Sequence, residues 1–287
     1  MQRRDMLMTA AAATFAATGP SVAAAADRRI RASDGVALHH EDWDSGRPVP
    51  FVHAWALTSA IWTYQVADLS QRGLRCITFD RRDHGRSGVP GRGYDLDRLA
   101  DVQLALDDVA LVGMSMGCNE ILNYVGRHGT QRISRIAMLG PTTPFPLQTT
   151  DNAHGAARGF FEQSWAAWQS DFPKWIEDNW LPFFTPGTSA QMMEWVAAMM
   201  RQTPIPVAVV TNHVLIATDL CPVLAQVDRP GLILHGDKHV SAPLDMTGRP
   251  TAAGIKDAEL KVYPGGPDGL FVTHMKQVNA GLAAFLA

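Results

Sequence analysis

The first half of the chain alternates short apolar runs with segments in which apolar residues recur every three or four positions. The apolar runs are typical of buried strands and cover residues 49–53, 74–79, 109–112 and 133–139. The segments between them have the spacing of amphipathic helices and cover residues 58–69, 96–106 and 118–125. This alternation predicts a parallel sheet with helices on both faces. Residues 36–43 alternate with a period of two and predict an antiparallel strand before it.

The pattern changes after Pro141. Residues 145–225 predict helices and loops without a clear strand, and five of the eight tryptophans lie there. Strands resume at 231–235 and 260–263, and a last amphipathic helix follows. The sequence therefore predicts an α/β core from residues 27–144 and 226–287, with 145–225 inserted as a helical cap over the reactive end of the sheet. The cap's tryptophans either fill its own core or face a substrate.

The first 26 residues have the pattern of an export signal. Arg3-Arg4 precede an Ala- and Thr-rich apolar run, which ends in the small residues Ala24-Ala25-Ala26. This order resembles a twin-arginine signal and predicts a periplasmic or secreted protein. The alternative is an uncleaved membrane anchor, but the run is short for a membrane span and contains Gly19-Pro20. We therefore expect no stable membrane insertion once residues 1–26 are removed.

Composition narrows the class of protein. The 287 residues are 46% hydrophobic and 18% charged, which is ordinary for a globular enzyme. A net charge of −3 provides no basic field, so nucleic acid is not an expected partner. Three cysteines are too few for a disulfide framework. The histidines lack the spacing of zinc ligands, and no nucleotide-binding motif is present.

The chemistry centres on residues 113–117, which read Gly-Met-Ser-Met-Gly. A predicted strand precedes this Gly-x-Ser-x-Gly motif and a predicted helix follows it, which is the context of a nucleophile elbow. Such a turn is tight, leaves no room for a Cβ at its glycines and exposes the serine hydroxyl. Ser115 is therefore the candidate nucleophile, although the motif by itself also occurs by chance in glycine-containing turns.

The chain as a whole resembles the α/β-hydrolase fold and, more narrowly, the cofactor-free haloperoxidase-like aryl esterases and perhydrolases. The resemblance rests on residues 51–55, 79–87, 113–117, 123–129, 234–237 and 269–274. It implies a small-molecule substrate, an acyl-enzyme at Ser115, and no metal or organic cofactor. It also implies an oxyanion hole made by the backbone N–H groups of Trp55 and Met116. Ala54 stands where the family usually has glycine.

Two positions depart from the family pattern. The family's acid follows its seventh core strand, where this chain has His239, and the family's histidine follows the last strand, where this chain has Asp268. The two residue types have thus exchanged places. A Ser-His-Asp triad is defined by geometry and roles rather than by chain order, so the exchange is chemically conceivable. His239 would then take the proton from Ser115, and Asp268 would orient the imidazole.

Three interpretations of the exchange remain open. Ser115, His239 and Asp268 form a working but rearranged triad; or another base serves, such as His274 or Asp268 itself with Asp237 as the acid; or the triad is impaired. The first two predict a serine hydrolase of small, mostly apolar esters or lactones, with perhydrolase or haloperoxidase-like side activity. The third predicts a hydrolase-fold protein that binds a small apolar ligand or does non-hydrolytic chemistry.

Two smaller departures concern the region before the elbow. Asp83 replaces a glycine usual in the family, and we expect it to make only surface ion pairs, which contribute little to stability. Residues 94–109 form a shorter segment than the family usually has. This shortening predicts a truncated helix in front of the elbow strand and a looser cover on one face of the sheet.

Overall fold

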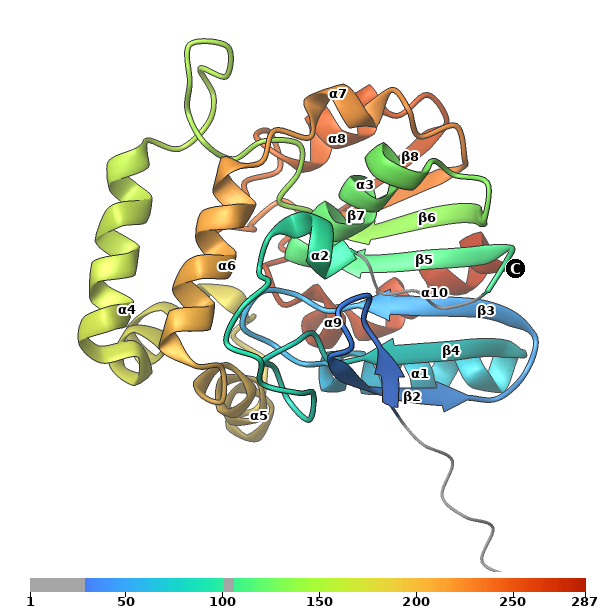
Figure 1. Cartoon of the computed structure of the whole chain (residues 1–287), viewed down its shortest axis with the longest axis horizontal. Coiled ribbons are helices and arrows are strands. Elements are labelled where there is room, and N and C mark those ends of the chain that lie inside the picture. Colours follow the sequence, from blue (N-terminus) through green and yellow to red (C-terminus); the bar gives the residue numbers. More distant parts are fainter. Residues whose placement is uncertain (1–28, 101–105) are drawn as a thin grey trace, which may run out of the picture.

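The architecture is a twisted sheet between two layers of helices, with three further helices beyond one end of the strands (Figure 1). The computed structural model describes residues 29–100 and 106–287, so the export signal expected at 1–26 lies outside the described residues. The strands are β1 (Arg29–Arg31), β2 (Ala37–Trp43), β3 (Arg47–Val52), β4 (Leu74–Phe79), β5 (Val109–Met114), β6 (Ile133–Leu139), β7 (Gly231–Gly236) and β8 (Ala258–Tyr263). Their spatial order is β1-β2-β4-β3-β5-β6-β7-β8.

The sheet is mostly parallel, as predicted. The pairs from β4 through β3, β5, β6 and β7 to β8 are all parallel, whereas β2 is antiparallel to both β1 and β4. The expected antiparallel strand at residues 36–43 is therefore β2. Parallel strands bring their carboxyl ends to one edge, so the turns after β3, β5, β6 and β7 meet there.

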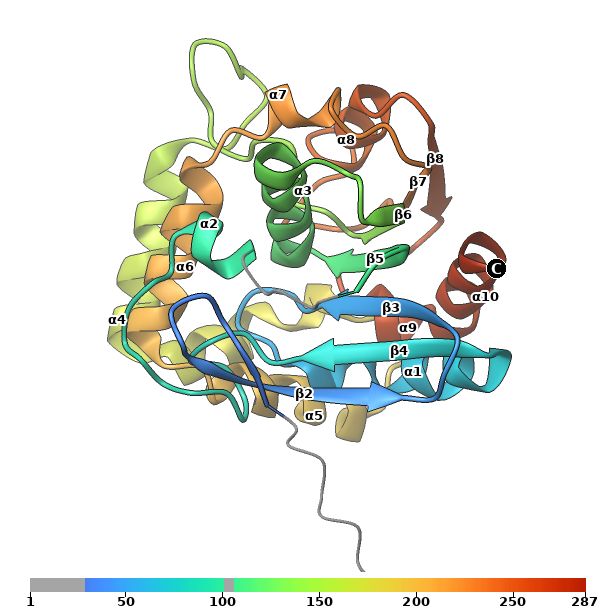
Figure 2. The ribbon, with the colours of Figure 1, turned by 45° about the vertical axis from the view of Figure 1, so that its right-hand side comes forward.

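Helices cover both faces of the sheet (Figure 2). The helices of the described residues are α1 (Thr63–Leu69), α2 (Leu96–Ala100), α3 (Met116–His128), α4 (Arg158–Asn179), α5 (Ala190–Arg201), α6 (Ile205–Ala217), α7 (Cys221–Leu224), α8 (Gly248–Gly254), α9 (Leu270–Thr273) and α10 (Met275–Leu286). Helices α1 and α10 contribute to one apolar core cluster, and α3 and α7 to another. In β5, Ala110 and Val112 belong to the first cluster and Val109 to the second, because successive side chains of a strand point to opposite faces.

The segment expected to be helical, 145–225, contains α4, α5, α6 and α7, which are joined by loops and by the 3₁₀ helix η3 (Leu181–Phe183). Helices α4, α5 and α6 lie beyond the carboxyl ends of the strands (Figure 1). Trp165 and Trp168 are buried in a third apolar cluster that these helices share with Ala56 and Met116 of the core. Among the helices that the structure describes, none has the length and hydropathy needed to cross a membrane.

Candidate active site

Ser115 occupies a strained turn between β5 and α3. Its backbone has φ 50° and ψ −117°, a conformation that residues with a Cβ rarely adopt. A Cβ at Gly117 would collide with the carbonyl oxygen of Val52, and one at Gly113 would lie 2.8 Å from Ile121 Cδ1. The two glycines of the motif therefore let α3 start directly against the ends of β3 and β5. This is the nucleophile elbow expected from the sequence.

Ser115 lies in a cavity of about 390 Å³ between the sheet and the helical segment. The helical segment contributes mostly apolar side chains to its wall: Phe160, Trp175, Ile176, Asn179, Trp180, Phe183, Phe184, Val196, Ala197 and Met200. The core contributes Ala54, Trp55, Leu57, Met114, Ser115, His239, Val240, Ser241 and Asp268. Of the tryptophans in the helical segment, Trp175 and Trp180 thus face the cavity, whereas Trp165 and Trp168 fill an apolar core. A mostly apolar wall with a few polar groups at one point suits a small, mostly apolar molecule.

The backbone N–H groups of Trp55 and Met116 are the candidate oxyanion donors. Met116 is the first residue of α3, so its N–H belongs to the group of helix-starting donors that have no partner within the helix. Trp55 follows β3, and its indole Nε1 donates to the carbonyl oxygen of Ala208 at 2.9 Å in α6. Its ring also packs against Trp168, with centroids 4.5 Å apart. The helical segment therefore fixes the loop that carries the first candidate oxyanion donor.

His239 and Asp268 form a buried pair beside this cavity. His239 Nδ1 lies 2.9 Å from Asp268 Oδ1, and the two side chains are 3% and 7% exposed. Asp268 also accepts hydrogen bonds from the Val240 N–H at 2.9 Å and from the Ser241 hydroxyl at 2.5 Å. The loop after β7 thus supplies three donors to a carboxylate that follows β8. The exchanged residues inferred from the sequence are brought together.

The imidazole extends from Asp268 toward the end of β6. A Cβ at Gly140, the residue after β6, would lie 3.0 Å from His239 Nε2, so Nε2 faces this glycine. Gly140 follows Leu139, whose carbonyl oxygen accepts the Ser115 N–H at 3.0 Å. His239 therefore directs Nδ1 to the carboxylate and Nε2 toward the end of β6, whose last residue binds the Ser115 N–H.

The neighbours of His239 determine which of its ring nitrogens carries the proton. The Ala242 N–H also approaches Nδ1, at 3.1 Å, and a single nitrogen cannot both accept from this group and donate to Asp268. We assign the proton to Nδ1, because a donor facing a carboxylate at 2.9 Å makes the stronger, charge-assisted bond. Nε2 then has a free lone pair. Among the described residues, the Ser115 hydroxyl makes no hydrogen bond, so it is not bonded to Nε2 in this structure.

Asp268 is held in its charged form. Burial raises the pKa of this carboxyl group, but the hydrogen bond and charge of His239, together with the bonds from Ser241 and Val240, lower it by more. The pKa of Asp268 therefore lies below its usual value. A carboxylate that is charged at neutral pH can hold the tautomer of His239 and stabilise the imidazolium that forms when His239 takes a proton.

We expect Asp268→Asn to lower the free energy of unfolding at neutral pH by roughly 1–3 kcal/mol, because it weakens hydrogen bonds to a buried charge. A carboxyl group with a lowered folded-state pKa stabilises the fold above its unfolded pKa, about 3.9, and loses this contribution as pH falls through the folded value. The gap between variant and wild type should therefore shrink below about pH 4. Urea unfolding at neutral and acidic pH measures it, and a gap that does not change with pH would contradict the assignment.

The other candidate bases and acids lie elsewhere. His274 joins α9 to α10, where its Nδ1 lies 3.0 Å from the Thr273 hydroxyl. Asp237 accepts the Gly265 N–H at 2.7 Å. Neither residue belongs to the part of the described chain that lines the Ser115 cavity. The geometry therefore favours His239 over His274 as the base.

The expectation that Asp83 makes only surface ion pairs is wrong. This side chain is 4% exposed, and its backbone has φ 57°, the conformation that suits the glycine usual in the family. Burial and a hydrogen bond with Asp83 raise the pKa of Tyr94 to about 12. Asp83 is thus part of a buried polar loop. Of the short helix expected at 96–106, α2 is described over Leu96–Ala100, and residues 101–105 lie outside the described residues.

Two residues of the site were not identified from the sequence. Ser241 donates to Asp268, and the available signal was a hydroxyl only two residues after His239 in the same loop. Arg81 lies beneath the loop of Trp55, and its position just after the buried strand β4 was the corresponding signal.

Comparison with known proteins identifies the family of the chain. The family model described as alpha/beta hydrolase fold matches residues 47–274. A non-heme haloperoxidase of Rhodococcus erythropolis is 34% identical over 285 residues, which cover 90% of this chain and 98% of that protein. A non-heme chloroperoxidase of Kitasatospora aureofaciens is 34% identical over 268 residues, covering 88% and 97%.

Solved structures give the same result. A bromoperoxidase from Bacillus anthracis superposes with a TM-score of 0.85 at 29% identity, covering 90% of this chain and 99% of that one. An esterase from Exiguobacterium antarcticum superposes with a TM-score of 0.86 at 25% identity, covering 90% and 98%. The chain therefore belongs to the α/β-hydrolase family, in its haloperoxidase-like branch.

Proposed function

We propose that the protein is a serine hydrolase that cleaves small, mostly apolar carboxylic esters or lactones through an acyl-enzyme at Ser115. One observation carries the proposal: the strained Ser115 opens into an apolar cavity beside the hydrogen-bonded pair His239–Asp268. The named relatives agree with this chemistry. A bifunctional esterase/perhydrolase of Acinetobacter calcoaceticus is 27% identical over 276 residues, covering 90% of this chain and 98% of that protein.

The reaction starts with a proton transfer. His239 Nε2 takes the proton from the Ser115 hydroxyl as the oxygen attacks the ester carbonyl. The carbonyl π electrons move onto its oxygen, and the N–H groups of Trp55 and Met116 stabilise this oxyanion. The C–O bond to the alcohol then breaks, and the imidazolium returns its proton to the leaving oxygen. Asp268 stabilises the imidazolium throughout.

Water completes the cycle by the same route. His239 removes a proton from a water molecule, the hydroxide attacks the acyl carbonyl, and Ser115 leaves with the returned proton. If hydrogen peroxide replaces water, the same step releases a peracid, which accounts for the proposed perhydrolase and haloperoxidase-like side activity. Both activities share one nucleophile and one cavity.

The test is covalent labelling of the purified protein. A fluorophosphonate should add one phosphonyl group, and peptide mass spectrometry should place that group on Ser115. 4-Nitrophenyl acetate should be turned over, and prior labelling should abolish the turnover. The Ser115 hydroxyl makes no hydrogen bond within the described chain, which is what a ligand-binding protein on this scaffold would also show. Absence of both labelling and turnover, with saturable binding of an apolar ligand, would favour that second function.

A further inference from the structure

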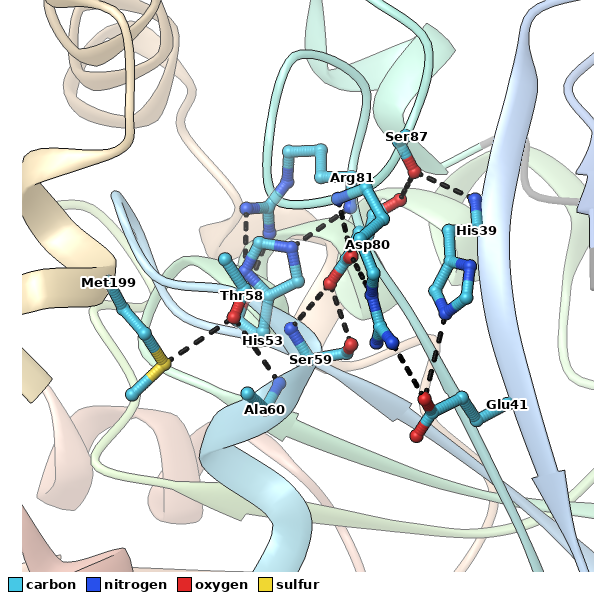
Figure 3. A network of polar contacts seen from close by, with 11 residues as sticks. His39, Glu41, His53, Thr58, Ser59, Ala60, Asp80, Arg81, Ser87 and Met199 are labelled. Atoms are coloured by element: carbon cyan, nitrogen blue, oxygen red, sulfur yellow. Dashed lines mark hydrogen bonds and ion pairs between the residues drawn. The ribbon is translucent and has the colours of Figure 1, made fainter. Parts of the chain in front are cut away.

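A buried arginine lies directly beneath the loop that carries Trp55. Arg81 follows β4, and its side chain is 2% exposed. Its Nη2 donates to the carbonyl oxygen of His53 at 2.8 Å, and Nη1 donates to that of Ala54 at 3.4 Å. Its backbone N–H donates to His53 Nε2 at 3.0 Å (Figure 3). One residue thus binds both peptide units that precede Trp55.

Arg81 approaches both ring nitrogens of His53, with Nη1 3.2 Å from Nδ1 and the backbone N–H 3.0 Å from Nε2, and a neutral ring can accept at only one of them. We assign the acceptor to Nε2, because the backbone N–H is the shorter contact and has no other acceptor there. Nε2 accepts a hydrogen bond, so the ring proton is on Nδ1, which lies 2.9 Å from the Ala54 carbonyl oxygen and donates to it. Burial and the charge of Arg81 hold the pKa of His53 well below its usual value, so the ring is neutral. Both donors draw the Ala54 carbonyl to the Arg81 side of the loop.

The orientation of one peptide plane follows from this. In a trans peptide, the C=O of one residue and the N–H of the next point in opposite directions. With the Ala54 oxygen directed at Arg81 and His53, the Trp55 N–H points to the other side, where Ala54, Trp55 and Ser115 line the cavity. Arg81 therefore sets the direction of the first candidate oxyanion donor.

Arg81 also reaches the element that carries the second donor. Its Nε donates to Glu120 Oε1 at 2.6 Å, and Nη2 forms an ion pair with the same oxygen. Glu120 is on α3, about one turn after Met116, the residue whose N–H is the second candidate donor. The guanidinium group is thus a bridge between the Trp55 loop and the elbow helix.

Asp80, the residue before Arg81, binds the other end of the Trp55 loop. Asp80 Oδ1 accepts the backbone N–H of Ser59 at 2.8 Å and its hydroxyl at 2.6 Å (Figure 3). The segment from His53 to Ser59 is therefore held at both ends by two consecutive residues that follow β4. Since the distance between two backbone donors decides how well they fit an oxyanion, this attachment bears on the rate of the reaction.

We propose that Arg81 is a positioning residue of the oxyanion hole: by binding the His53 and Ala54 carbonyls and Glu120 at once, it sets the separation and direction of the Trp55 and Met116 N–H groups. This inference rests on the proposed serine hydrolase function. A lysine cannot replace the arginine, because an ammonium group is a point charge on a flexible chain and lacks the rigid fork of five N–H donors.

The test compares Arg81→Lys with Arg82→Lys. Arg82 is a matched control, because it is the adjacent residue and equally buried, but it pairs with Asp34 instead of the Trp55 loop. For 4-nitrophenyl acetate, Arg81→Lys should lower kcat by ~10- to 100-fold, a fraction of the loss seen when one oxyanion donor is removed outright. KM should change little, because the donors act on the transition state rather than on the bound substrate.

A tetrahedral mimic separates positioning from general damage. The affinity of phenylboronic acid, which forms a tetrahedral adduct with a serine hydroxyl, should fall in parallel with kcat in Arg81→Lys, whereas the affinity of planar benzamide should stay within a few-fold. Arg82→Lys should change neither affinity. If Arg81→Lys raises only KM, or weakens both ligands equally, or behaves like Arg82→Lys, the inference is overturned.

A second variant covers the case in which Arg81→Lys does not fold. Glu120→Gln keeps an acceptor for Arg81 but removes the charge. The inference predicts for this variant too a lower kcat with little change in KM, and weaker binding of phenylboronic acid with little change for benzamide. Failure of the proposed function has a different signature. In that case the wild type neither turns over the ester nor binds the boronic acid at Ser115, whereas failure of this inference alone leaves the wild type active and Arg81→Lys equal to its control.

Discussion

Ser115→Ala is expected to lower kcat for 4-nitrophenyl acetate by ~10⁶-fold, the order of the loss when the serine of such a triad is removed. The change deletes one oxygen and leaves no buried group without a partner, since the hydroxyl makes no hydrogen bond in the described chain. Thermal stability should therefore change little, and the loss is a loss of chemistry. Steady-state kinetics and fluorophosphonate labelling measure it.

Ser164→Ala is the matched control for this change. Ser164 is a half-buried serine of α4, and within the described chain its hydroxyl donates to the carbonyl oxygen of Phe160 in its own helix. This variant should keep wild-type turnover and labelling. A Ser115→Ala protein that still took up one phosphonyl group, or kept more than about a tenth of its activity, would show that another residue is the nucleophile.

Much of the fold could be predicted because apolar residues recur with a different spacing in its strands and in its helices. The runs predicted at 74–79 and 133–139 are β4 and β6, since strands buried on both faces are mostly apolar along their whole length. The elbow could be predicted because a tight turn between a strand and a helix leaves no room for a Cβ at its two glycine positions. Residue Asp83 could not be placed, because its burial depends on how the loop after β4 folds back, and a charged residue at a turn is usually exposed.

The residues of the site could be predicted from the sequence, but the directions in which their side chains point could not. The motif comparison identified the exchange of His239 and Asp268, yet it left open whether a carboxylate would stand between the imidazole and the serine. The structure shows how each of the two side chains is held. Asp268 is short and is held by the loop after β7, through Val240 and Ser241, whereas the longer imidazole reaches across to Gly140. How far each side chain extends depends on the conformation of its loop, which cannot be predicted from the spacing of apolar residues.

In the proposed reaction, the exchanged residues would fill the roles of the triad from different loops. The imidazole now comes from the loop after β7 and the carboxylate from the loop after β8. Because Nδ1 still faces the carboxylate, Nε2 remains the free nitrogen. What catalysis requires is this polarity from acid to base to nucleophile, and chain order does not enter into it. The exchanged arrangement therefore leads to a sharp expectation about His239.

His239→Ala is expected to lower kcat by ~10³- to 10⁴-fold, because no other group on the Ser115 cavity can take the serine proton at neutral pH. Asp268 is a poor substitute, since His239, Ser241 and Val240 lower its pKa. His274→Ala, the matched control, should stay within about threefold of wild type, because a residue outside the site contributes no transition-state binding. Turnover of 4-nitrophenyl acetate across neutral pH measures both. A tenfold or smaller loss in His239→Ala, or a large loss in His274→Ala, would show that the exchanged residues are not the working base and acid.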